Sequence, residues 1–178
     1  MRKHVQDLLA HAEWADAVFF RAWAKGDRED REIRERASHA SGTNELFVKA
    51  LTGRDDLPWD KIMKGEVKPP WAGREPRAFD ELRSYSRSNH EGLRSFAAAS
   101  SEADLEKMVT IPWFPDPPCV ISVGEALVQA AMHSHHHRGQ NITRLRHIGG
   151  EPKNADYIIW LWKGRPAAAW EGSVSTNA

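Results

Sequence analysis

Apolar residues recur every three or four positions in four long segments, and this spacing limits most strongly how the chain can fold. It places apolar side chains on one face of an α-helix, where they can pack against other helices. The four segments run over about 3–24, 30–51, 79–99 and 122–148. Strand signals are weak by comparison; the best covers 107–113 and is interrupted by Pro112. We therefore predict an all-α protein, a four-helix bundle.

The connections between these segments carry the residues that end helices. Gly53 follows the second segment as a C-terminal cap, and Ser122 with Glu125 has capping-box spacing at the start of the last segment. The stretches 54–76 and 111–118 are rich in proline, so we predict long irregular connections there.

The length of 178 residues favours a single domain. We place the bundle at 1–165, with a short helix near 154–163, and expect a loose C-terminal tail at 166–178.

Charge and cysteine content exclude several classes of protein. Lys and Arg together number 25, as do Asp and Glu, so there is no basic excess for binding nucleic acid. The apolar runs are too short to span a bilayer, and the first residues lack the apolar stretch of a signal peptide. The single cysteine, Cys119, excludes an intrachain disulfide and a cysteine-rich zinc site. We expect a cytoplasmic protein that binds neither nucleic acid nor membranes.

Four of the nine histidines fall within residues 133–137, inside the last helical segment. His133 and His137 are four residues apart, so on a helix they point about 40° from each other, one turn apart. Such a pair can hold one divalent ion if a third ligand comes from another helix. The candidates for that ligand outside the cluster are His4, His11, His39 and His90.

An isolated pair with this spacing is also common on solvated helix faces, so the alternative of no metal site stays open. His135 and His136 point elsewhere and fit surface or capping roles better than ligation. Gln140 and Arg144 continue the line of His133 and His137. We expect at least one of them to line the same site and orient a ligand or water; the alternative is that both bind neighbouring helices.

Three motifs, in order along the chain, resemble those of the DinB-like (damage-inducible) metal-binding four-helix bundles. They are "HAEWAD" (11–16), "HASGTNELFVKALTG" (39–53) and "HSHHHRGQ" (133–140). The last is close to the H-x-x-x-H-R-G-Q pattern of that family, and the resemblance extends over roughly 4–162.

This resemblance implies that His39, His133 and His137 are the metal ligands and that the ion is Zn²⁺ or Ni²⁺. In some members the metal activates a low-molecular-weight thiol, such as bacillithiol or mycothiol, for transfer to or isomerisation of a small-molecule substrate. Two other possibilities stay open: a metal-dependent hydrolase that uses bound water, and a non-catalytic metal-stabilised stress-response module. No further catalytic residue can be assigned.

The chain departs from the family pattern at three positions. Gln129 stands where many members have another histidine, which favours a three-histidine site over a four-histidine site. Asp16 replaces an asparagine and His11 an aromatic residue. Three neutral imidazoles would leave open positions on an ion, as in catalytic sites.

Members of the family often dimerise. Tryptophan-rich segments around Trp59, Trp71, Trp113, Trp160 and Trp162 add to the expectation of a homodimer. The alternative is that these tryptophans cover the open ends of the bundle.

Overall fold

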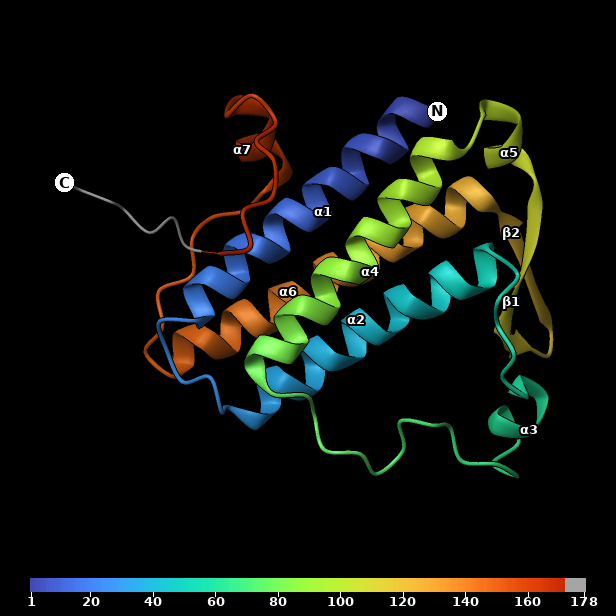
Figure 1. Ribbon diagram of the computed structural model, residues 1–178, viewed down its shortest axis with the longest axis horizontal. Helices are drawn as coiled ribbons and strands as arrows, with labels where there is room; N and C mark the ends of the chain where they lie inside the picture. The colour runs from blue at the N-terminus through green and yellow to red at the C-terminus, as the bar shows by residue number, and fades with distance from the viewer. Residues whose placement is uncertain (172–178) are drawn as a thin grey trace.

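The computed structural model describes residues 1–171, and within them the chain is mostly helical (Figure 1). The elements are α1 (Arg2–Trp23), α2 (Arg31–Leu51), α3 (Trp59–Met63), α4 (Phe79–Ala99), α5 (Glu102–Glu106), β1 (Met108–Pro115), β2 (Pro118–Ser122), α6 (Val123–His147) and α7 (Tyr157–Trp162). The predicted all-α four-helix bundle is confirmed, with α1, α2, α4 and α6 as its long helices. None of the helices in this range is both long and apolar enough to cross a membrane.

The four long helices form a ring in which each packs against two neighbours. α1 and α2 each contact both α4 and α6. α1 and α6 run in one direction, and α2 and α4 run in the other (Figure 1). The chain must therefore return along the bundle between α2 and α4, a distance of about 30 Å for helices of this length. This explains the long 54–76 connection, which carries the short helix α3.

The stretch 111–118 is not irregular throughout as expected, because it forms the turn end of an antiparallel hairpin made by β1 and β2. Met108 pairs with Ser122 and Val109 with Ile121. The prolines that argued against strands lie where the pairing is disturbed, between Ile111 and Pro115. A proline cannot donate to a ladder, and a bulge accommodates it without breaking the rest of the hairpin.

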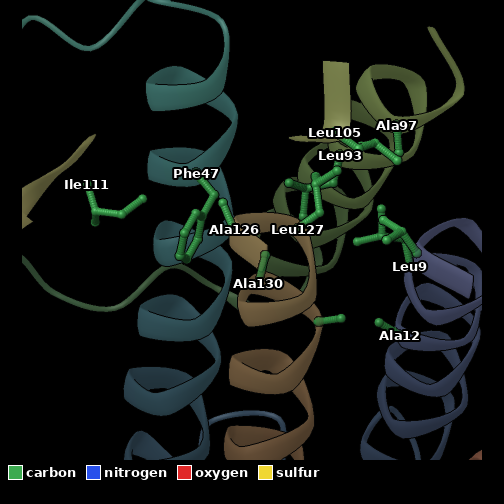
Figure 2. Close-up of a cluster of buried hydrophobic side chains, with 12 residues drawn as sticks. Leu9, Ala12, Phe47, Leu93, Ala97, Leu105, Ile111, Ala126, Leu127 and Ala130 are labelled. Carbon is green, nitrogen blue, oxygen red and sulfur yellow. The ribbon is translucent and has the colours of Figure 1, made fainter. Parts of the chain in front are cut away.

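Two apolar clusters fill the bundle at its two ends. The first lies near the hairpin and joins α1, α2, α4 and α6; ten of its side chains are labelled in Figure 2, among them Leu9, Phe47, Leu93 and Leu127. The second lies near the α1–α2 connection and includes Phe20, Trp23, Ile33, Phe79 and Leu145.

A buried polar layer separates these two clusters. Following each long helix, the buried positions change from apolar to polar and back to apolar. The layer consists of Asp16 from α1, Ser41 and Asn44 from α2, Ser86, Asn89 and His90 from α4, and Ser134, Arg138 and Asn141 from α6. Asn44 Nδ2 donates to Ser134 Oγ at 3.0 Å, and Asn89 Nδ2 donates to the Ser41 carbonyl at 3.0 Å. Hydrogen bonds between helices therefore satisfy part of the layer.

The expected loose tail from residue 166 differs from the structure at Trp170. This side chain is only 5% exposed and packs in the second apolar cluster. Its Nε1 donates to Glu13 Oε1 of α1 at 3.2 Å. Burial of an indole explains why the segment stays on the bundle this far. The rest of the expected tail, 172–178, lies outside the described residues.

Candidate metal centre

His39, His133 and His137 converge where α2 packs against α6. One nitrogen from each side chain lies within 4.8 Å of the corresponding nitrogens of the other two. The ring centroids are 5.1 Å apart for His39 and His133, 4.8 Å for His39 and His137, and 4.4 Å for His133 and His137. The i, i+4 spacing on α6 and the packing of α2 against it bring the three rings together. This group could hold one metal ion.

The hydrogen bonds of the rings leave nitrogens free to act as ligands. His133 Nε2 is buried and has no hydrogen-bond partner within residues 1–171. His137 Nδ1 donates to Gln140 Oε1 at 2.8 Å. That bond selects the tautomer with a lone pair on His137 Nε2, as the bond opposite a metal-bound nitrogen commonly does. Gln140 Nε2 in turn donates to His136 Nε2 at 3.1 Å, which fixes the orientation of the amide.

The surroundings keep the three rings neutral, the form that coordinates metal. Burial lowers the pKa of His133 to about 4, with a smaller contribution from repulsion by the neighbouring histidines. Burial also lowers the pKa of His39 and of His137; for His137, the bond to Gln140 opposes this effect. The chemistry of these donors therefore fits a borderline divalent ion such as zinc or nickel.

The other histidines proposed as a third ligand lie elsewhere. His4 is exposed near the start of α1. His11 is bonded through Nε2 to the Ala155 carbonyl at 2.9 Å and packs on Tyr157. His90 is bonded to Asp16 inside the bundle. Of the four candidates, the structure brings only His39 to the pair on α6.

The two residues expected to continue the ligand face have different surroundings. Gln140 contacts His137, as described above. Arg144 instead binds the start of α2: its Nη2 is 2.7 Å from Asp30 Oδ2, and its Nε is 3.1 Å from Glu32 Oε2. Asp30 is also the N-terminal cap of α2, because its Oδ1 accepts from the Ile33 N–H. Arg144 thus joins two helices at the level of the second apolar cluster.

Sequence reasoning missed an ionic group behind the three histidines. Arg138 Nη1 donates to Asp16 Oδ1 at 2.7 Å, and His90 Nε2 donates to Asp16 Oδ2 at 2.7 Å. Burial acts to raise the pKa of Asp16, but Arg138 and His90 outweigh it, so the pKa is lowered and the carboxylate is charged. The available signal was Asp16, a charged residue at the start of the apolar run in the second half of α1.

A hollow in the surface lies at another place on the molecule. It measures about 950 Å³ and lies between α1, α4 and the chain after α6, with Arg21, Arg83 and Gly149 in its lining. The three histidines take no part in that lining, as far as residues 1–171 are concerned. His39 is the most exposed of the three, so their site opens to solvent on the α2–α6 face.

Fold and site together define a class: four-helix bundles with a three-histidine group that could hold a divalent ion. The family model described as the DinB family matches residues 1–168, and the chain belongs to this family. Neither a curated protein nor a solved structure matches the chain.

Proposed function

We propose that the protein is a divalent-metal-dependent enzyme of the DinB family that activates a thiol for transfer or isomerisation. His39, His133 and His137 would hold the ion, Zn²⁺ or Ni²⁺. The convergence of these three side chains from two helices is the observation that carries the proposal.

The surroundings of the three histidines would fix the protonation and the orientation of their rings before an ion or a substrate binds. Burial favours neutral imidazoles, so little proton release is needed when an ion binds. Gln140 holds the ring of His137 in one tautomer and one orientation. When bound, a divalent ion with three neutral ligands supplies open coordination positions and a positive charge that lowers the pKa of a thiol or water.

The exposure of His39 supports a reactive site over a closed structural site. Structural zinc sites are usually surrounded by four protein ligands, whereas catalytic sites keep a position for water or substrate. The group offers three histidines and faces solvent, which fits the second arrangement. A low-molecular-weight thiol and a small electrophilic substrate could approach from the α2–α6 face.

The test is a transferase screen with metal-loaded protein. Several low-molecular-weight thiols, bacillithiol and mycothiol among them, are each supplied with an electrophilic or isomerisable substrate. Loss of free thiol reports transfer, and conversion of the substrate without loss of thiol reports isomerisation. The proposal expects turnover that needs both the metal and one thiol, and that disappears in His133→Ala. Turnover of ester or amide substrates without any thiol would support the hydrolase instead. Metal binding without turnover in any assay would favour the non-catalytic module.

His147→Ala is the matched control, because His147 is an exposed histidine on the same helix. It should retain full turnover and full metal content. Equal loss in His147→Ala and His133→Ala would mean that the activity does not arise at the three-histidine group.

A further inference from the structure

The buried ion pair between Asp16 and Arg138 is costly for stability alone. Arg138 is 5% exposed and Asp16 is 9% exposed, and His90, which shares the carboxylate, is 1% exposed. The desolvation of such a pair often exceeds its Coulombic gain, and apolar side chains of similar volume often serve stability as well or better. The best-attested use of a buried polar contact is to fix how helices are registered.

The three residues of this group come from three different helices. Asp16 lies on α1, His90 on α4 and Arg138 on α6. Both carboxylate oxygens are used, one by each partner. The guanidinium is further restrained by its Nη2, which donates to His135 Nδ1 at 3.2 Å. The group therefore fixes the rotation of α6 about its own axis relative to α1 and α4.

That rotation decides where the two histidines of α6 point. At about 100° per residue, Arg138 lies about 120° around the helix from the mean direction of His133 and His137. α6 packs against α1 on one side and against α2 on the other. When Arg138 is held toward Asp16 of α1, the two histidines are directed toward His39 of α2.

The tolerance of a metal site makes this rotation important. A side-chain tip lies about 5–6 Å from the helix axis, so a rotation of about 20° displaces it by about 2 Å. Metal–ligand distances vary by only about 0.2 Å. The apolar clusters alone accept such small rotations, because methyl groups pack with little directional preference, whereas a hydrogen-bonded ion pair does not.

We propose that the Asp16–Arg138–His90 group positions the histidines of α6 for metal binding, and that this is why the charges are kept inside the bundle. The proposal rests on the proposed metal site and concerns its geometry. These residues touch neither metal nor substrate; they act through α6.

The test replaces the group with apolar side chains in the triple variant Asp16→Leu/His90→Leu/Arg138→Met. Stability is measured without metal, and affinity is measured for Zn²⁺ and Co²⁺. We expect the metal-free melting temperature to stay equal or rise, while affinity falls about 10- to 100-fold, the range seen when the groups behind metal ligands are removed. The visible absorption of bound Co²⁺, which reports coordination geometry, should change as well.

Leu93→Ala is the control for general loosening. Leu93 is a buried residue of α4 in the first apolar cluster and belongs to no part of the group. This variant should lose stability but keep metal affinity within a few-fold and keep the Co²⁺ spectrum. A triple variant with unchanged affinity and spectrum would overturn the proposal, as would parallel losses of stability and affinity in both variants.

Crystal structures of the metal-free parent and triple variant test the positioning role independently of metal binding. In the triple variant we expect the centroid distances from His39 to His133 and His137, now 5.1 and 4.8 Å, to lengthen. If these distances are kept, the positioning role is wrong. If the parent binds no ion, the proposed metal function fails, but this comparison still tests whether the group aims the histidines.

Discussion

At the residue scale, the three histidines make stability depend on pH in the metal-free protein. The pKa of His133 falls from 6.5 to about 4 on folding, so the unfolded chain binds a proton more readily. The contribution of His133 to stability is therefore fully present above pH 6.5 and is lost as the pH falls toward 4. The shift corresponds to at most about 3 kcal/mol.

We expect metal-free His133→Gln to lose less stability than the parent protein between pH 7 and 4.5, as measured by urea denaturation. His4→Gln, at an exposed histidine, should follow the parent curve. A parent whose stability is flat over this range would show that His133 is not buried as described.

Gln140 provides a second prediction at this scale. Gln140→Ala removes the acceptor for His137 Nδ1, so the ring loses its preferred tautomer and orientation. We expect metal affinity to fall about 10- to 100-fold with little change in metal-free stability. Competition with a chelating dye measures this change.

Arg146→Ala, an exposed change on the same helix, is the control and should bind metal like the parent. Equal affinities for the parent and Gln140→Ala would leave the glutamine without a role in the site.

The residues of the site were predictable to different degrees. The i, i+4 pair on α6 follows from helical geometry, so His133 and His137 could be paired from sequence alone. The choice of His39 over His4, His11 and His90 depends on which helices touch, and only the family resemblance indicated it. Arg144 lies on the same face of α6 as His133 and His137, but its side chain binds Asp30 at the start of α2. Helical periodicity does not reveal a contact between residues so far apart in sequence.

At the scale of elements, Asp30 at the N-terminus of α2 links α2 to α6. Asp30 caps α2 through the Ile33 N–H and also binds Arg144 of α6. We expect Asp30→Ala to destabilise the protein by about 1–2 kcal/mol, the usual cost of losing a helix cap. Asp30→Asn keeps the capping oxygen but loses the charge and the oxygen that accepts from Arg144, whereas Asp30→Ala loses the cap as well, so thermal denaturation should show a smaller effect for Asp30→Asn. A larger loss of stability for Asp30→Asn than for Asp30→Ala would contradict the role of Asp30 as a helix cap.

The segment that ends with Trp170 contributes more to stability than a tail would. Its indole packs on Phe20 and donates to Glu13, which also accepts from Arg94 of α4 at 2.5 Å. We expect Trp170→Ala to cost about 3–5 kcal/mol, as for other buried aromatic residues.

Trp162 is the matched control, because it lies nearby in sequence but is 78% exposed. Trp162→Ala should change the free energy of unfolding by no more than about 0.5 kcal/mol. Chemical denaturation of both variants makes the comparison, and a Trp170→Ala variant as stable as Trp162→Ala would mean that the segment does not brace the bundle.

Elements with strong periodicity could be predicted closely, and those that depend on distant partners could not. The four long helices begin and end near the expected residues because each carries its own apolar face, and α2 and α6 also begin at side-chain caps, Asp30 and Ser122. The hairpin was missed because Pro112 and Pro115 argue against a strand. In the structure the pairing of β1 with β2 is disturbed between Ile111 and Pro115 and is regular from Met108 to Ile111. Trp170 was missed because nothing in its local sequence shows that α1 and α4 leave room for an indole.

At the scale of the whole molecule, we predict a homodimer. Trp59 and Trp160 are buried within the chain, at 7% and 2% exposure, so they are not available for an interface between chains. Trp71 and Trp162 remain 47% and 78% exposed, and we expect the interface to include Trp71 but not Trp162. Light scattering should give twice the chain mass of 20.1 kDa over a range of concentrations. A mass equal to that of one chain throughout would refute the dimer.

A bound ion should also stabilise the whole bundle, because it would tie α2 to α6. An ion present at about 1,000 times its Kd adds about 4 kcal/mol to the native state. For a domain of this size, that corresponds to a fall in Tm of roughly 10 °C when a chelator removes the metal. A chelator that leaves the Tm of metal-containing protein unchanged would show that the site does not brace the helices.

Calorimetric titration of chelator-treated protein with Zn²⁺ and Ni²⁺ tests the central claim most directly. The account predicts one ion per chain for the parent and for His147→Ala, and loss of that binding in His39→Ala, His133→Ala and His137→Ala. Retained binding in any of these three variants, with unchanged affinity and stoichiometry, would contradict the assignment of the site, and a parent that binds neither ion would contradict the metal-dependent function.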